Sequence, residues 1–397
     1  MTDDKKMLRD ICQHELCTGC MACVNVCGHS SIQITEDELG FRYPKINTAT
    51  CTDCGLCSTV CPVNNPTSKS FPSDCYAFAL RLPRELEKSS SGGAATAIGA
   101  HIISTGGVVY GCSGEDIHHV EHIRVDSLPD LASLRGSKYV QSDCRGVYKS
   151  LRADLLAGKQ VVFIGVPCQV AGLRNFLRKD YENLLTVDLV CHGVPSQRLL
   201  DDNIARCKAK DPGMIENSVR FRRKRDFMSL SGEIEFIWSY TTSNNKVVRK
   251  NWYDDPYMFG FIEGLFYRSC CYECPYAYSI RTSDITLSDF WGLPAQAGYN
   301  TGRGVSSILV NTPRGRKFME EFIGSSESTA EIKPRKARES ISWNGQLMHP
   351  SFKSIAVDRF RSLYPEIGLS KSVDALLGTR KKRLLIKSLL QRIKKLL

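Results

Sequence analysis

Several features are missing from this 397-residue sequence. It has no uninterrupted apolar run near the ~18 residues that span a bilayer, which excludes a membrane bundle. No apolar segment follows its first residues, so nothing predicts secretion. It lacks G-x-G-x-x-G at a strand–helix junction and also G-x4-G-K-S/T, so any dinucleotide must bind in a fold other than the Rossmann type.

Acidic residues are absent from the last 20 positions, where eight Lys or Arg stand. The net charge is +11, so the rest of the chain carries only +3, and we expect no nucleic-acid partner. The 42% hydrophobic content predicts a globular protein, and the length allows two or three domains. Without a targeting segment, we expect the chain in the cytoplasm.

Eighteen cysteines are present, nine of them within the first 61 residues. A long, core-forming chain expected in the cytoplasm does not rely on disulfides, so this clustering predicts metal binding. Two runs have the C-x2-C-x2-C-x3-C spacing of bacterial ferredoxins: Cys17, Cys20, Cys23 and Cys27, then Cys51, Cys54, Cys57 and Cys61.

In such runs three thiolates hold one cubane and the fourth ligates the other cluster. If the fourth cysteine of each run ligates the cluster of the other run, one cluster is held by Cys17, Cys20, Cys23 and Cys61, and the other by Cys51, Cys54, Cys57 and Cys27. The alternative is two structural zinc sites, which typically use paired C-x2-C halves rather than a triple run. The spacing therefore predicts two 4Fe–4S clusters.

From about residue 74 onward, helix and strand patterns alternate. We expect helices over 91–104, 146–156 and 256–267 and one ending near 177, strands over 108–110, 161–164, 184–190 and 284–287, and a hairpin formed by 233–240 and 246–252. This alternation predicts an α/β domain with functional residues where strands end.

Two of these strands lead into cysteines, Cys168 and Cys191, and Cys271 and Cys274 form a separate C-x2-C pair. A lone cysteine after a strand is more often a buried apolar residue, and a lone C-x2-C can be a zinc site or a redox dithiol. Four thiols together suggest a third metal site, which spacing alone leaves open.

A glycine-rich segment and a basic segment are weaker indications of binding sites. Residues 89–93 open a small-residue helix whose free N–H groups could hold a phosphate, although an ordinary serine N-cap explains them too. Residues 220–225 hold five basic residues around Phe221, which we interpret as a solvated strand edge.

Together these motifs resemble the family of coenzyme F420 hydrogenase/dehydrogenase beta subunits, in the form with an N-terminal two-cluster ferredoxin domain. The resemblance extends from about residue 10 to residue 345. The residues that carry it in the second domain are 91–93, 136–139 with 141–142, 165–173, 188–195, 269–275 and 284–292. Ser288 departs from the glycine usual in the family.

The resemblance implies an FAD site lined by Ser91, Gly92, Gly93, Ser137 and Lys138. It also implies that the four scattered thiols hold a third 4Fe–4S cluster: Cys168, Cys191, Cys271 and Cys274. It assigns no catalytic residue. We interpret the six remaining cysteines as buried small hydrophobic residues: Cys12, Cys75, Cys112, Cys144, Cys207 and Cys270.

These implications predict an iron–sulfur flavoprotein oxidoreductase. Electrons would pass between a hydride carrier (F420 or a nicotinamide) or a small reducible substrate, through FAD, and the ferredoxin-type clusters. A ferredoxin or a redox partner subunit would exchange electrons with the clusters. Two alternatives stay open: an electron-relay subunit without a substrate of its own, and a reductase acting in surface-polysaccharide biosynthesis.

The predicted organisation is an α+β ferredoxin-like two-cluster domain over 1–70 and an α/β flavin and iron–sulfur domain, without the Rossmann fingerprint, over 74–345. An extension over 346–377 and a basic amphipathic helix over 378–397 follow. One face of that helix is apolar: Leu385, Ile386, Leu389, Leu390, Ile393, Leu396 and Leu397. Opposite stand Lys387, Gln391, Lys394 and Lys395. Such a helix either lies peripherally on the inner face of a membrane or docks against protein.

Overall fold

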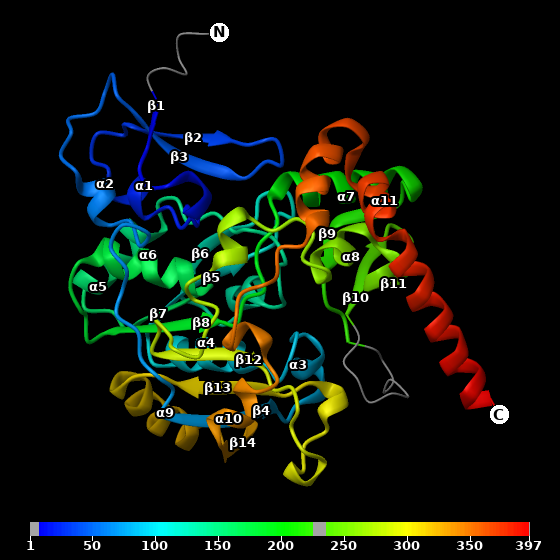
Figure 1. The fold of residues 1–397 in the computed structure, drawn as a ribbon. Helices are drawn as coiled ribbons and strands as arrows, with labels where there is room; N and C mark the ends of the chain where they lie inside the picture. Colours follow the sequence, from blue (N-terminus) through cyan, green and yellow to red (C-terminus); the bar gives the residue numbers. More distant parts are fainter. Residues whose placement is uncertain (1–7, 225–235, 397) are drawn as a thin grey trace.

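The computed structural model describes residues 8–224 and 236–396. Its N-terminal part has an antiparallel sheet in the order β1-β3-β2, formed by β1 (Leu8–Asp10), β2 (Ile32–Glu36) and β3 (Arg42–Asn47). Two one-turn helices, α1 (Ala22–Val26) and α2 (Leu56–Thr59), follow the cysteine loops. Figure 1 shows this part, in blue, above the rest of the molecule.

The second part is built on an eight-stranded sheet in the order β14-β4-β13-β12-β8-β7-β5-β6. The strands are β4 (Asp74–Leu80), β5 (Val108–Ser113), β6 (Glu121–Val125), β7 (Val161–Gly165), β8 (Leu184–Leu189), β12 (Ile285–Asp289), β13 (Ser306–Val310) and β14 (Ala330–Arg335). Strands β5, β7, β8 and β12 are parallel neighbours, and the outer strands pair antiparallel. The central strands are apolar almost throughout because helices cover both faces.

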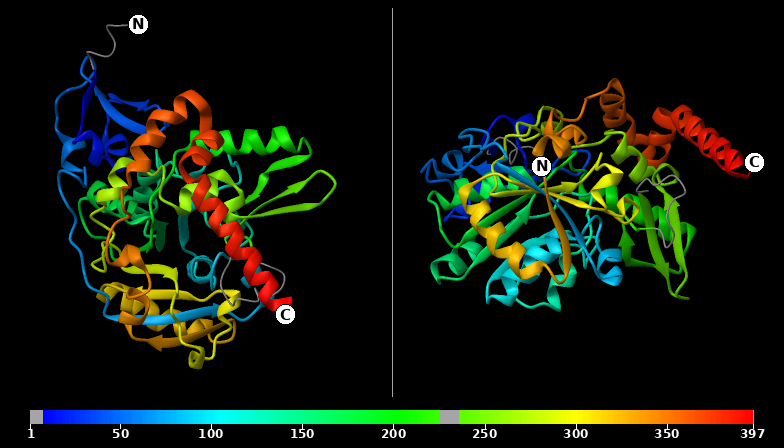
Figure 2. Two further views of the ribbon diagram at one scale, coloured as in Figure 1. Left: turned by 45° about the vertical axis from the view of Figure 1, so that its right-hand side comes forward. Right: turned by 90° about the horizontal axis from the view of Figure 1, so that it is seen from below.

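Helices form a layer on each face of this sheet. On one face α4 (Ala94–Ser104) and α9 (Pro313–Ser326) contribute to one core. On the other, α5 (Val147–Leu156) and α6 (Pro167–Leu177) contribute to a second core, which also contains Cys20, Met21 and Val60 of the N-terminal part. The cysteine-rich part therefore packs directly on the α5–α6 layer (Figure 2).

A smaller lobe completes the molecule. It contains the antiparallel sheet of β9 (Met214–Arg220), β10 (Ile237–Thr242) and β11 (Val247–Asn251), with helices α7 (Gln197–Lys210), α8 (Pro256–Ile262) and α11 (Ile355–Leu396). Its aromatic-rich core includes Trp238, Tyr257 and Phe266, each fully buried.

The remaining short elements connect these layers. They are α3 (Pro83–Glu87), α10 (Ala337–Ile341) and the 3-10 turns η2 (His14–Leu16), η3 (Asp130–Leu134), η4 (Trp252–Asp254), η5 (Ser269–Glu273), η6 (Ala295–Ala297), η7 (Thr301–Arg303) and η8 (Gly345–Leu347). No helix in the described part of the chain is both long enough and apolar enough to cross a membrane.

The α/β alternation predicted from the sequence is confirmed, with two boundaries moved by glycine. The helix expected over 91–104 begins at Ala94, because Gly93 takes a left-handed φ of 91°. The helix expected over 256–267 ends at Ile262, because Gly264 has a φ of 65°. The hairpin forms as predicted at β10 and β11, and residues 233–235 of it lie outside the described residues.

Candidate functional site

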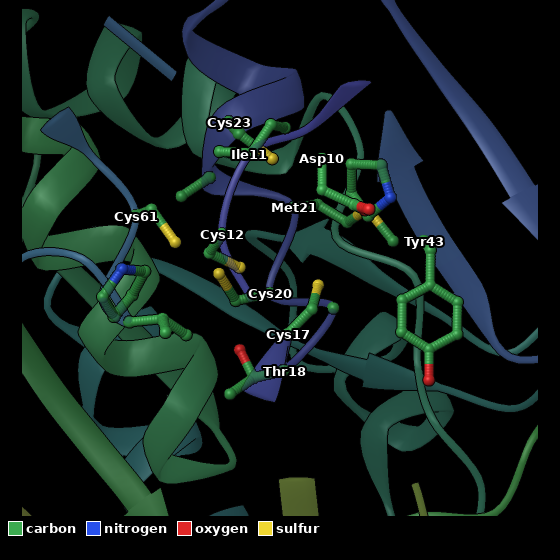
Figure 3. A pocket seen from close by; sticks show the side chains of 15 residues that line it. Asp10, Ile11, Cys12, Cys17, Thr18, Cys20, Met21, Cys23, Tyr43 and Cys61 are labelled. Atoms are coloured by element: carbon green, nitrogen blue, oxygen red, sulfur yellow. The ribbon is translucent and has the colours of Figure 1, made fainter. Parts of the chain in front are cut away.

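The crossed pattern of the two cysteine runs is visible in space. Cys17, Cys20, Cys23 and Cys61 line one cavity, and Figure 3 shows these side chains around it. Cys17, Cys20 and Cys23 come from the loop and first turn around α1, and Cys61 follows α2. The loop bends at Gly19, whose φ is 67° and where a Cβ would lie 2.4 Å from Nε2 of Gln141.

A fifth thiol, Cys12, points into the same cavity (Figure 3). Hydrogen bonds to the sulfurs of Cys17 and Cys61 raise the pKa of Cys12, and the bond from Cys12 lowers the pKa of Cys17 to about 5. With this side chain inside, the cavity has about 20 Å³ of free space. Cys12 is partly buried, but its partners are other thiols, so the interpretation as an inert hydrophobic residue is wrong for it.

The other four thiols of the two runs, Cys27, Cys51, Cys54 and Cys57, line a second cavity of about 240 Å³. It lies nearer to solvent, since Cys54 is exposed. Among the residues that the structure describes, no three His, Cys, Asp or Glu side chains come together closely enough to hold one metal ion. The thiols instead line two cavities in crossed sets of four, as the ferredoxin spacing predicts.

The third predicted set meets at the carboxyl ends of two neighbouring parallel strands. Cys168 opens α6 directly after β7, and Cys191 follows β8, which pairs with β7. Burial raises the pKa of Cys191 to about 12, with Cys274 as the next contribution. Burial likewise raises the pKa of Cys168, and Cys274 and Cys191 raise it further. The structure thus brings thiols that are far apart in the sequence close enough for the charge on one to shift the pKa of another.

Cys270 joins this third set as well. A hydrogen bond with Cys271 lowers the pKa of Cys270 and raises that of Cys271. Its charge also influences Cys168, Cys191 and Cys274. Like Cys12, it is a fifth thiol beside a set of four rather than an inert core residue. Of the other four unassigned cysteines, Cys75, Cys144 and Cys207 are buried and Cys112 is partly buried, as interpreted.

One residue that the sequence did not single out, Arg268, lies between the first and third sets. Its Nε donates a hydrogen bond to the backbone oxygen of Cys17 at 2.6 Å, and its guanidinium lies 4.1 Å from the ring centre of Tyr43. The side chain is fully buried, and Nη2 has no hydrogen-bond partner in the part of the chain that the structure describes. Burial disfavours the Arg268 cation, but Cys17 and then Cys270 more than offset this, so its pKa is raised.

A buried cation requires nearby negative charge. The strongest neighbours that favour the charged form of Arg268 are thiols and Tyr43. A thiolate-bound cluster supplies that negative charge, because cluster ligands are deprotonated. The donor set, the buried guanidinium and its unpartnered N–H therefore fit iron–sulfur clusters at the first and third sets.

Two further residues hold these sets close together. Gly172 in α6 faces Cys20, and a Cβ there would lie 2.8 Å from the Cys20 sulfur. Burial raises the pKa of Tyr276, with added contributions from Cys168 of the third set and Cys20 of the first. The N-terminal part thus places its first set of thiols against the third set.

The five residues predicted to line an FAD site form a compact group. The backbone N–H of Ser137 donates to Oγ of Ser90 at 2.8 Å, which joins the two segments. Lys138 donates to three backbone carbonyls at 2.9 to 3.3 Å, and burial lowers its pKa to about 8. Ser91 donates to the backbone oxygen of Val305 at 2.9 Å. Gly92 and Gly93 precede the start of α4.

Arg222 and Lys224 of the basic segment contribute to this group, which corrects the interpretation of a solvated edge at these two residues; Arg220 is exposed, and Arg225 lies outside the described residues. Arg222 is 5% exposed and forms two hydrogen bonds with the carboxylate of Asp289, at 2.6 and 3.0 Å. Lys224 donates to the backbone oxygens of Leu86 and Ser91 at 2.7 and 2.6 Å. Burial, and then Arg222, lower the pKa of Lys224 to about 7. Nε of Arg222 is buried and has no hydrogen-bond partner among the described residues.

Comparison with known protein families finds a match in each of the two parts of the chain. Residues 16–65 match the 4Fe-4S dicluster domain. Residues 158–335 match the family described as the C terminus of the coenzyme F420 hydrogenase/dehydrogenase beta subunit.

Individual relatives agree with these matches. The chain is 22% identical over 343 residues to one of the subunits of F(420)H(2) dehydrogenase from Methanosarcina mazei, covering 82% of this chain and 88% of that protein. A 57-residue stretch is 39% identical to an uncharacterised polyferredoxin-like protein of Methanocaldococcus jannaschii, covering 12% of this chain and 34% of the other.

Among solved structures, a chain of the F420-reducing NiFe hydrogenase complex from Methanosarcina barkeri is similar, with a TM-score of 0.45 and 17% identity over 80% of this chain and 94% of that one. The resemblance inferred from the motifs is confirmed: residues 158–335 match the C terminus of the coenzyme F420 hydrogenase/dehydrogenase beta subunit, and the N-terminal part matches a 4Fe–4S dicluster domain.

Proposed function

We propose that this chain is an iron–sulfur flavoprotein oxidoreductase that passes electrons between a hydride carrier and a redox partner. One observation carries the proposal: three sets of thiols occur in one chain, and Arg268, Gly172 and Tyr276 join the first and third of them. Bound 4Fe–4S clusters would supply one-electron transfer there. The chain's own residues fix how far apart the sets lie.

The sets suggest an order for the electron path. The third set lies in the second domain, at the sheet edge where sites of α/β proteins collect. The first set packs against it, and the second set, with the exposed Cys54, is nearest to solvent. We propose that a partner takes or gives electrons at the second set. The named relative is one subunit of a dehydrogenase, which supports a partner subunit over a free ferredoxin.

The group around Ser91, Lys138 and Lys224 is the proposed FAD site. Two buried lysines, whose pKa values burial lowers, and Arg222, paired with Asp289, are the basic side chains there; a bound anion would favour the charged forms of the lysines. The start of α4, whose first N–H groups are free of helical partners, adds donors for an anion. These residues fit a cofactor that carries phosphate groups. Arg222 and Lys224 therefore join the five residues proposed for FAD.

For the hydride carrier we propose coenzyme F420. The support is that the relative sharing most of its length with this chain is named as part of an F(420)H(2) dehydrogenase. Nicotinamide or a small substrate, and a relay role without a substrate, are the other outcomes of the same experiment. The residues that would contact the carrier are not assigned.

The test is anaerobic purification of the full chain, followed by iron, sulfide and flavin analysis. We expect about 12 irons, from three cubanes, and one FAD per chain. Reduced F420, NADH and NADPH are then added separately while the flavin band is followed. Bleaching by reduced F420 alone supports the proposal. Full iron without flavin, or no bleaching by any donor, would favour the relay role.

Lys224→Met is a specific variant for the flavin site. It should reduce the flavin content severalfold and leave the iron content unchanged, because Lys224 bonds to the Ser91 loop and not to any thiol set. Lys208→Met is the matched control, since Lys208 is an exposed lysine whose ammonium bonds to a backbone oxygen in the small lobe. Equal flavin in both variants would remove Lys224 from the site.

A further inference from the structure

The last helix, α11, packs on the small lobe over part of its length, and its final turns extend away from the molecule. After a break at Gly368 (φ 75°, ψ 173°), it packs on the small lobe through Val373, which is buried. Leu384 also contacts that core, and Arg380 forms an ion pair with Glu263 at 2.5 Å. Figure 1 and the right-hand view of Figure 2 show its final turns extending beyond the body of the molecule.

The apolar stripe of this helix lies away from that docking face. Successive residues are rotated by about 100°, so Leu385, Ile386 and Leu390 stand about 100°, 160° and 120° from Leu384 around the axis. Their exposed fractions of 44%, 58% and 54% agree with this. The sequence repeats apolar residues at the same helical spacing through Leu389, Ile393 and Leu396.

This geometry separates two explanations of an amphipathic tail. A helix that docks on its own domain turns its apolar stripe inward. Here the inward side is already used by Leu384 and the Arg380–Glu263 pair, and the stripe occupies the opposite side. The described part of the chain, residues 8–224 and 236–396, therefore cannot cover Leu385, Ile386 and Leu390 without releasing the contacts that hold the helix.

The charges around the stripe are of one sign. By the same rotation, Lys381 and Arg383 stand at the two borders of the apolar sector, and Lys382 stands within the sector, one turn before Ile386. The sequence repeats these positions three turns later with Arg392 and Lys394, and no acidic residue occurs from 378 to 397. Cations at both borders of an apolar sector suit a helix lying in the plane of an anionic bilayer, where long side chains reach the headgroups. A partner helix would instead offer mixed charges.

We propose that the C-terminal segment from Lys381 onward binds an anionic membrane surface, with Leu385, Ile386 and Leu390 entering the interface. The helix lies on the bilayer rather than crossing it, in accord with the lack of a spanning helix among the described residues. This docking is independent of the proposed reaction. It would hold the oxidoreductase beside membrane-bound redox partners.

The test is co-sedimentation of the full chain with vesicles. One set contains phosphatidylcholine and phosphatidylserine, and the other contains phosphatidylcholine alone. We expect binding to the anionic vesicles, lost on raising the salt from about 0.05 to about 0.5 M because exposed charges are screened. Lys381→Gln with Arg383→Gln should weaken binding by about 25-fold, from about fivefold for each cation.

Ile386→Ser with Leu390→Ser tests the apolar part and should weaken binding by about tenfold or more. Ile355→Ser is the matched control, because Ile355 is an apolar residue of the same helix that is 83% exposed and lies outside the stripe. Equal sedimentation of all variants, or no binding to anionic vesicles, would overturn the proposal. A doubled mass in solution that only the Ile386 and Leu390 changes abolish would assign the stripe to a second copy of the chain.

Discussion

Arg268→Gln removes the positive charge that the structure places between the first and third sets of thiols. Its Nε bonds to the backbone oxygen of Cys17, and the magnitude is worked for an assumed separation of about 7 Å between a unit cation and the added electron. With an effective dielectric constant of about 20, the cation stabilises one added electron by about 2.4 kcal/mol. Since about 59 mV corresponds to a tenfold change for one electron, the expected fall in reduction potential is about 100 mV.

The direction follows from charge. A reduced cluster is one unit more negative than the oxidised cluster, so losing a nearby cation destabilises the reduced form. The assay is a redox titration of the anaerobically purified protein, followed by electron paramagnetic resonance. The cluster at the second set, with Cys54, is the internal control and should keep its potential, because no interaction joins that set to Arg268 in the described structure.

Two comparisons separate charge from packing. Arg268→Lys keeps the cation but loses the forked hydrogen bonding, so its potential should change by a small part of about 100 mV. Iron content shows whether each variant still holds its clusters. An unchanged potential in Arg268→Gln with full iron content would refute the electrostatic role, and equal shifts in both variants would assign the effect to packing.

Three further predictions concern the cysteines and one histidine. Cys20→Ala should lose about four irons per chain, whereas Cys12→Ala should keep all of them, because crossing already supplies four ligands without Cys12. Cys274→Ala should lose about four irons per chain from the third set. Cys207→Ala is the control and should lose no iron, because Cys207 lies in the core of the small lobe. Equal iron content in the two variants would show that the third set holds no cluster. Burial lowers the pKa of His118, but hydrogen bonds to two carboxylates outweigh it and leave the pKa raised. Its stabilisation should be full below pH ~6.5 and lost as pH rises through the folded pKa, so the Tm difference between wild type and His118→Gln should shrink on going from about pH 6 to about pH 8; a constant difference would contradict this.

The N-terminal site could be predicted from sequence because its chemistry is local. Three thiols in one short loop fix a set by spacing alone, and only Cys61 and Cys27 had to be assigned by crossing. The structure groups them in that way. The third set needed an α/β pattern as well, since Cys168 and Cys191 meet only because β7 and β8 are parallel neighbours. Ligation at all three sets stays a prediction.

Sequence could not reveal residues that act through distant partners. Arg222 was interpreted as solvated because its neighbours in sequence are basic, but Asp289, 67 positions away, pairs with it in the interior. Arg268 has no spacing signal, since the acceptor of its Nε, the backbone oxygen of Cys17, lies 251 positions away in the other domain. Cys12 and Cys270 lie outside the predicted ligand spacings; Cys12 meets Cys17 and Cys61 in the folded chain, and Cys270, a sequence neighbour of Cys271, comes near Cys168 and Cys191 only after folding.

The position of β4 in the large sheet has a consequence for biosynthesis. This strand directly follows the cysteine-rich part, yet its partners on both sides, β13 and β14, come from 306–335. The sheet therefore stays open until most of the chain has left the ribosome, whereas the N-terminal sheet of β1, β2 and β3 closes within the first 47 residues. Contacts so distant in sequence form late, and domains emerging first fold first. The dicluster part can thus be complete, and receive its metal, before the surface against which it packs exists.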